Sequence, residues 1–216
     1  MSLIYPIVGI ALARLALGLD VLPLLFPVVA GFALIGPVAA IGLYEISRRR
    51  ELGLEVTWRD AFNVLRSPSL GSIAALGVPL LVIFLVWLAT ANAIYIASFG
   101  YAPAASMPDF LTRVFTTREG WELILLGNGV GFLFAVVVLA ISAISFPLLL
   151  DRDVGAITAV LTSVRAVSRN PVPMAVWGLI VAVSLAIGAI PFFLGLAVVV
   201  PVLGHATWHL YRRVVA

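Results

Sequence analysis

Residues 72–96 read SIAALGVPLLVIFLVWLATANAIYI, a stretch of 25 residues without one charged side chain. An α-helix rises about 1.5 Å per residue and the hydrocarbon core of a bilayer is about 30 Å thick. A helix of about 20 mainly apolar residues therefore crosses the bilayer. This stretch is long and apolar enough to predict a transmembrane helix.

Further apolar stretches flank this one on both sides. We expect six spans, over approximately residues 3–19, 21–44, 72–96, 122–150, 172–190 and 192–211. The prolines of the second, Pro23, Pro27 and Pro37, predict a kinked helix. No basic segment precedes the first span, so we expect it to be retained and not cleaved as a signal peptide. The sequence thus predicts an all-α polytopic transmembrane bundle of about six spans, with 1–216 forming a single transmembrane domain.

The composition excludes a water-soluble globular protein. Hydrophobic residues make up 63% of the chain and charged residues 11%, and the mean hydropathy is +1.19. A soluble domain carries about 25% charged residues, so this chain has too few to cover a water-facing surface. The chain has no cysteine, which excludes disulfides, thiolate metal sites and cysteine nucleophiles.

The basic residues indicate how the chain is oriented. All thirteen are arginine, and ten of them lie in the connectors 45–71 and 151–171 and in the C-terminal tail. These ten are Arg48, Arg49, Arg50, Arg59, Arg66, Arg152, Arg165, Arg169, Arg212 and Arg213. The connector on the other side carries only Arg113 and Arg118. Arginine-rich loops stay in the cytoplasm, so we expect both termini on the cytoplasmic side of a bacterial inner membrane.

The arginines also predict the partner of the cytoplasmic face. A basic residue near the surface of an anionic membrane contributes about 1 kcal/mol of attraction. We therefore expect the lipid bilayer, and anionic lipid in particular, to contact these arginines, Arg152 excepted, and we expect no nucleic acid partner. The expected aromatic anchors at the two interfaces are Tyr5, Tyr44, Trp208 and Tyr211 inside and Tyr95, Tyr101 and Trp121 outside.

The two cytoplasmic connectors resemble each other. Residues 50–53 read RELG and residues 152–155 read RDVG, and an amphipathic stretch, a proline and a span follow each. We expect interfacial helices at about 54–66 and 154–169, with Thr57 and Asp60 capping the first. The expected apolar face of the first helix comprises Leu54, Trp58, Ala61, Phe62 and Leu65, opposite Glu55, Arg59, Asp60, Asn63 and Arg66. That of the second comprises Val154, Ile157, Val160, Leu161, Val164 and Val167, opposite Thr158, Thr162, Arg165 and Arg169. The pattern indicates a parallel repeat of span, interfacial helix and span; chance similarity of two short connectors is the alternative.

Three motifs carry a resemblance to a known family. They read GLYEISRRRE over 42–51, FPLLLDRD over 146–153 and GHATWHLYRR over 204–213. They resemble the bacterial integral membrane family called domain of unknown function 2189, and the likeness covers nearly the whole chain. Members usually begin with a longer cytoplasmic N-terminal segment. The resemblance implies a multi-pass membrane fold and no established activity.

Two ionisable residues are candidates for a polar site in or beside the membrane. Arg14 lies in the first span, where it either snorkels to the interface, pairs with Asp20 or Glu122, or forms part of a substrate or ion site. Glu45 closes the second span next to a run of arginines. A solvated or lipid-facing charge cluster is the alternative to a functional role for Glu45.

Asn128 is the third polar candidate, and two histidines are weak candidates for a metal. Asn128 lies in the segment GNGVG of the fourth span, where it either coordinates an ion or substrate or hydrogen-bonds a neighbouring helix. His205 and His209 are four residues apart and so share a helical face, a spacing that suits haem or a metal. Two ligands do not complete a site, so we expect no metal and no other cofactor.

The sequence favours a non-enzymatic protein. No phosphate loop, nucleophile elbow, zinc signature or pair of intramembrane carboxylates is present. Few intramembrane ionisable residues, abundant small residues and short loops favour an accessory or assembly protein that packs against a membrane protein partner or a second copy of itself. The alternatives are a small-solute or ion permease that uses Arg14 and Asn128, and a haem- or metal-binding protein that uses His205 and His209.

Overall fold

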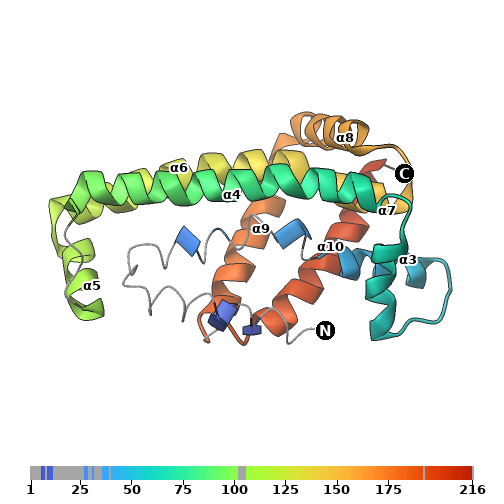
Figure 1. The fold of residues 1–216 in the computed structure, drawn as a ribbon, viewed down its shortest axis with the longest axis horizontal. Coiled ribbons are helices and arrows are strands. Elements are labelled where there is room, and N and C mark those ends of the chain that lie inside the picture. The colour runs from blue at the N-terminus through green and yellow to red at the C-terminus, as the bar shows by residue number, and fades with distance from the viewer. Residues whose placement is uncertain are drawn as a thin grey trace.

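Every secondary-structure element that the structure describes is a helix (Figure 1). The computed structural model describes residues 6–7, 9–11, 27–28, 31, 36–38, 40–101, 106–191 and 193–215. The elements are α3 (Ile41–Glu51), the 3₁₀ helix η2 (Trp58–Arg66), α4 (Leu70–Phe99), α5 (Met107–Thr116), α6 (Arg118–Ser142), α7 (Ser145–Asp151), α8 (Ala156–Arg169), α9 (Pro171–Ala189) and α10 (Leu196–Val215). The predicted all-helical class is confirmed.

Three helical segments are long and apolar enough to cross a membrane. They are Leu70–Phe99, Arg118–Asp151 and Pro171–Ala189, and they overlap the predicted spans 72–96, 122–150 and 172–190. Helix α10 overlaps the predicted span 192–211 but begins at Leu196. The predicted span 3–19 and most of 21–44 lie outside the described residues.

Helices α4 and α6 run side by side along the length of the molecule, and α9 and α10 are inclined to them (Figure 1). Trp87 of α4 is buried where α4 meets α6, with its ring centroid 5.6 Å from that of Phe134 of α6. Gly131 faces this indole, and a Cβ at position 131 would lie 3.0 Å from it. The Trp87 N–H donates to the carbonyl of Pro27 at 2.9 Å, so the buried indole leaves no polar atom without a partner.

The predicted span 122–150 is divided into α6 and α7. The backbone N–H of Ile144 donates to the Ser163 hydroxyl of α8 at 3.2 Å instead of continuing the helix. Pro147 has no N–H to offer the carbonyl of Ala143, which removes a further bond of the helical ladder. Helix α8 therefore stabilises a break that hydropathy alone does not indicate.

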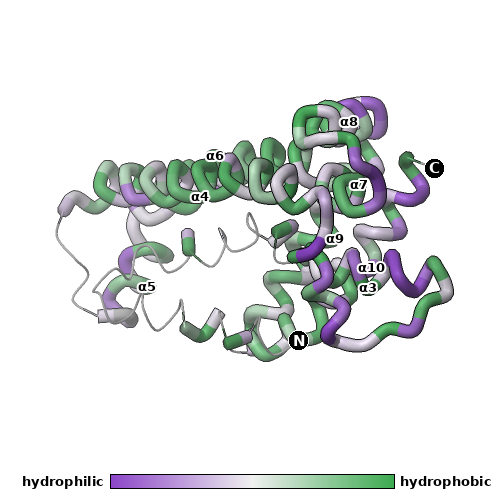
Figure 2. Tube along the Cα trace, turned by 45° about the vertical axis from the view of Figure 1, so that its right-hand side comes forward, coloured by the Kyte–Doolittle hydropathy of each residue, from purple (hydrophilic) through white to green (hydrophobic). Residues whose placement is uncertain are grey.

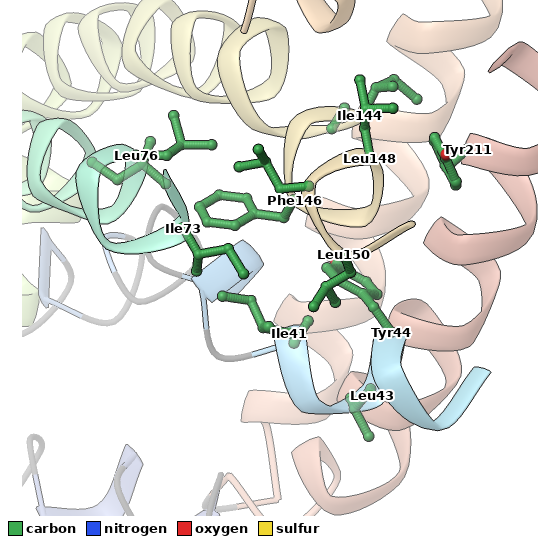
Figure 3. Close-up of a cluster of buried hydrophobic side chains, with 14 of the residues drawn as sticks. Ile41, Leu43, Tyr44, Ile73, Leu76, Ile144, Phe146, Leu148, Leu150 and Tyr211 are labelled. Carbon is green, nitrogen blue, oxygen red and sulfur yellow. The ribbon is translucent and has the colours of Figure 1, made fainter. Parts of the chain in front are cut away.

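Helix α7 forms the centre of the hydrophobic core at one end of the bundle. Its residues Ser145 to Leu150 are all buried. In Figure 3, Phe146 lies beside Ile73 of α4, and Leu150 lies beside Tyr44 of α3. The core thus joins segments that are far apart in the sequence, and it sets the ends of α3, α4 and α7 next to one another.

The first connector helix differs in its geometry from the expected one. Element η2 is a 3₁₀ helix, in which residues three apart share a face. Ala61 and Val64 consequently face the protein and are buried, whereas Phe62 and Leu65 are exposed on a second face. Contrary to the expectation, Ala61 is buried and does not belong with the exposed apolar residues Trp58, Phe62 and Leu65. The Asp60 carboxylate accepts hydrogen bonds from the Thr57 backbone N–H and hydroxyl at 2.7 and 2.8 Å, as the predicted cap requires.

The second connector helix, α8, packs on the bundle through small side chains. Ala159, Ser163 and Ala166 are buried, and Ile157 and Leu161 are exposed. The preceding Gly155 has a φ of 73°, and Gly53 at the matching place of the first connector has a φ of 70°. Both glycines adopt the left-handed conformation that favours glycine. The similarity of RELG and RDVG therefore extends to the backbone.

Exposed apolar surface covers the long helices. Figure 2 shows hydrophobic residues along α4 and α6 and hydrophilic residues gathered toward the end that carries α3 and α7. Trp121 and Tyr101 are exposed at the other end, as expected of interfacial anchors. Tyr44, Tyr95, Trp208 and Tyr211, also expected as anchors at the two interfaces, are buried within the protein.

Candidate functional site: a charged cluster at one end of the bundle

The ends of α3, α7 and α10 bring most of the paired charged side chains together. We call this set the charged cluster; it comprises Glu45, Arg48, Arg49 and Glu51 of α3, Asp60 of η2, Asp151 and Arg152 at the end of α7, and Trp208, Tyr211 and Arg212 of α10. Its members come from the three motifs of the sequence, with Asp60 added by the first connector. Residues separated by more than 150 positions therefore meet in one place.

Glu45 is held by an arginine of its own helix. Arg48 donates from Nε and from one Nη to the two carboxylate oxygens at 2.8 and 2.9 Å. Glu45 is only 4% exposed, so its charge is stabilised by this forked contact and not by water. The hydrogen bond with Glu45 raises the pKa of Arg48 above its ordinary value.

Helix α10 is attached to α3 and α7 through two carboxylates. Glu51 accepts from the Trp208 indole N–H and from Arg212, each at 2.8 Å. Asp151 accepts from the Tyr211 hydroxyl at 2.6 Å and from Arg212 at 3.2 Å. Arg212 thus bridges two acids from different helices. Trp208 and Tyr211 are 1% and 0% exposed, so both aromatic rings are core residues with their polar tips paired.

Gly204 permits the close approach of α10 to α3. A Cβ at position 204 would lie 2.7 Å from Cδ1 and 2.9 Å from Cβ of Leu43. One residue further along, His205 Nδ1 lies 2.6 Å from the Ser47 hydroxyl, which also contacts the Leu43 carbonyl at 3.0 Å. If the hydroxyl donates to that carbonyl, His205 carries its proton on Nδ1.

Element η2 joins the charged cluster through Asp60. Arg49 lies 3.4 Å from the Asp60 carboxylate, which also accepts from Asn63 at 2.9 Å. The hydrogen bonds from the Thr57 backbone and hydroxyl lower the pKa of Asp60 below its ordinary value. The Nε of Arg49 is buried and has no hydrogen-bond partner among the described residues.

Two cavities adjoin these helices. A groove of about 550 Å³ is lined by charged and polar residues: Glu45, Arg48, Arg49, Asn63, Arg66, Ser67, Pro68, Ser69, Leu150, Asp151, Arg152 and Asp153. A second cavity, of about 360 Å³, lies among α3, α6, α9 and α10 and is mainly apolar. The hydroxyls of Ser142 and Thr207 in its wall donate to carbonyls of their own helices, at 2.6 and 2.7 Å. The polar chemistry is therefore concentrated in the first groove.

The two candidate polar residues that the structure describes, Glu45 and Asn128, lie in different places. Arg14 lies outside the described residues. Asn128 is exposed on α6, where its amide donates to the Ile124 carbonyl of the same helix at 2.7 Å. Glu122, considered as a partner of Arg14, pairs with Arg118 at 3.0 Å. Of the two candidates that the structure describes, Glu45 belongs to the charged cluster and Asn128 does not.

The remaining candidate arginines and the two histidines lie at separate positions and not in one site. Arg59 lies over the ring of Trp58, with its guanidinium carbon 5.4 Å from the centroid. His209 is exposed, whereas His205 contacts Ser47. The exposed arginines at this end of the bundle include Arg50, Arg66, Arg165, Arg169 and Arg213. Within the part of the chain that the structure describes, no group of three or more metal-ligating side chains comes together.

Sequence reasoning missed the partners Glu51, Asp151, Trp208 and Tyr211. The two aromatic residues were assigned to the lipid interface because they lie near a span end. All four belong to the motifs that carry the family resemblance, so those motifs were the available signal. Hydropathy does not distinguish an aromatic ring beside lipid from one buried with a paired tip.

The long apolar helices, the exposed apolar surface and the paired charges at their ends define an integral membrane protein of helical class. The chain belongs to the family described as a predicted integral membrane protein, domain of unknown function 2189, whose model matches residues 24–151. The resemblance seen in the motifs is thus confirmed, and the third motif lies beyond the matched range. No curated protein and no solved structure matches the chain.

Proposed function

We propose that the protein is a six-span bacterial inner-membrane protein with both termini in the cytoplasm. Ten arginines on one side against Arg113 and Arg118 on the other support this orientation. Exposed apolar residues on η2 and α8, next to exposed arginines, support placing both connector helices in the inner interface.

Reporter fusions in the connectors test the topology. Fusions within 45–71 and 151–171 are expected to report the cytoplasm, and a fusion within 100–117 the opposite side. A control fusion after Val215 is expected to match the first two. Connectors 45–71 and 151–171 on opposite faces would contradict the proposal.

Within that topology, we propose a non-enzymatic accessory or assembly role. One observation carries it: eight of the described charged side chains at the cytoplasmic end are paired with one another across α3, η2, α7 and α10, while the described cavity among α3, α6, α9 and α10 is mainly apolar. Charges that are paired in this way hold helices together and leave few groups for chemistry. The arrangement suits a scaffold whose lipid-facing helices contact another membrane protein or a second copy of the chain.

Affinity purification in a series of detergents tests this role. Two copies of the chain with different tags are expressed together, so that a self-complex and a complex with another protein are distinguished. A stoichiometric partner of either kind is expected to remain bound in mild detergent. A chain that elutes as a monomer at every detergent strength would count against the proposal.

The permease alternative has less support. Asn128 faces away from the bundle, and the wall of the described apolar cavity offers few polar groups to a solute. Proteoliposome flux that falls on Asn128→Leu or Arg14→Ala substitution would favour transport over the accessory role.

A further inference from the structure

The groove beside the charged cluster has more free cationic groups than its acids neutralise. Glu45 is paired with Arg48, and Asp151 is paired with Tyr211 and Arg212. In the described part of the chain Arg66 makes no ion pair or hydrogen bond. Arg152 reaches Asp151 only at 3.7 Å. The unpaired guanidinium of Arg66 and the weakly paired one of Arg152 line the same groove.

Two further features add positive potential to this groove. The residues Ser67, Pro68 and Ser69, which line it, directly precede the 30-residue helix α4. The positive end of the α4 helix dipole therefore lies next to this groove. Arg49, which pairs with Asp60 at 3.4 Å, also lines the groove. The positive helix end and the guanidinium groups that line the groove both favour an anion.

The apolar residues beside the groove indicate which kind of molecule the anionic group belongs to. Asn63 and Arg66 line it from one face of η2, while Phe62 and Leu65 on the adjoining face are 52% and 65% exposed. The groove also lies at the ends of two segments apolar enough to span a membrane. A ligand that joins a negative head to apolar chains matches both surfaces at once.

We propose that this groove binds the phosphate of an anionic phospholipid, with Arg66 and Arg152 donating to its oxygens, Arg49 adding positive charge beside them, and the acyl chains lying against Phe62 and Leu65. The groove is a defined site and so differs from general attraction of arginines to a charged surface. Asp153, an exposed carboxylate in its wall, opposes binding. The proposal rests on the proposed topology only for assigning the groove to the cytoplasmic leaflet.

Thermal unfolding of the full chain in detergent, titrated with dioleoylphosphatidylglycerol, measures the apparent Kd. Arg66→Gln is expected to weaken binding roughly tenfold, the value of one charge-assisted hydrogen bond. Asp153→Asn is expected to tighten binding roughly fivefold, because it removes a negative charge. Arg165→Gln on α8 is the control: it removes the same charge from an exposed arginine at the same end and is expected to change little.

Three results would overturn the proposal. An equal loss of affinity in Arg66→Gln and Arg165→Gln would mean that the lipid is attracted to the charged surface as a whole and not to this groove. Equal protection by dioleoylphosphatidylcholine would exclude selection of anionic lipid. Protection by inorganic phosphate with the same dependence on Arg66 would make the groove a site for a soluble anion. Asp153→Asn is expected to tighten lipid binding, which a folding defect would not do. The titration is done in detergent, so a negative result would not contradict the proposed topology.

Discussion

The hydroxyl of Tyr211 in α10 donates a hydrogen bond to the carboxylate of Asp151 at the end of α7, with the two oxygens 2.6 Å apart. Sixty positions separate the two residues in the chain. Tyr211 is completely buried, and Asp151 also accepts from Arg212. The contact fixes the end of α10 against the segment that forms the core.

We expect Tyr211→Phe to lower the free energy of unfolding by about 1 kcal/mol, because Asp151, which is partly buried, loses one of its donors. Reversible unfolding in mixed detergent micelles measures the difference. Tyr101→Phe is the control, since Tyr101 is 87% exposed and should tolerate loss of its hydroxyl. Equal stability of both variants and the wild type would show that the hydrogen bond contributes nothing.

We expect Arg48→Gln to destabilise the protein by about 3 kcal/mol, because it leaves the buried Glu45 carboxylate without its forked partner. Arg50→Gln changes the same charge two residues further along α3, at an exposed side chain without a hydrogen bond to the described residues. Its effect should stay within about 0.5 kcal/mol. A similar loss in both variants would indicate that net charge, and not the Glu45 contact, determines stability.

We expect Gly204→Ala to destabilise the protein by about 1–3 kcal/mol, because the new methyl group would overlap Leu43. Gly127→Ala is the matched control in another helix, where no atom lies within 4 Å of the added Cβ. That substitution should be neutral or stabilising by up to about 1 kcal/mol. The double variant Gly204→Ala with Leu43→Ala should lose less stability than the sum of the two single variants if the overlap is the cause. The reverse order of the two glycine variants would refute the close approach of α10 to α3.

We expect Asp60 to stabilise the first connector in a pH-dependent manner. Its pKa in the folded protein is lowered, first by the hydrogen bond from the Thr57 backbone, below the value of about 3.9 in an unfolded chain. A lowered carboxyl pKa contributes stability that is fully present above the unfolded pKa and is lost as the pH falls through the folded one.

The melting temperature of the wild type should therefore exceed that of Asp60→Asn at pH 6–7, and the gap should close below about pH 4. Glu55→Gln is the control, since Glu55 is an exposed acid of the same connector without a hydrogen bond to the described residues. A gap that persists unchanged into strong acid would disprove the role of the ionised carboxylate.

Much of the fold was predictable because its signals are local. The uncharged run 72–96 appears in the structure as α4, and the amphipathic stretch 154–169 contains α8. Thr57 and Asp60 form the expected cap because both partners lie within one turn. The candidate site was less predictable: of the two described candidates, the structure brings Glu45 into the charged cluster and leaves Asn128 on the exposed face of α6.

The sequence by itself determined that this chain is a helical membrane protein, because hydropathy and helix length are properties of consecutive residues. Only the tertiary structure decided that α6 and α7 separate at Ile144, where Ser163 of α8 supplies the acceptor. It also decided that Trp208 and Tyr211 face Glu51 and Asp151 and not lipid. Burial and pairing depend on which helix packs opposite, and no local pattern of residues contains that information.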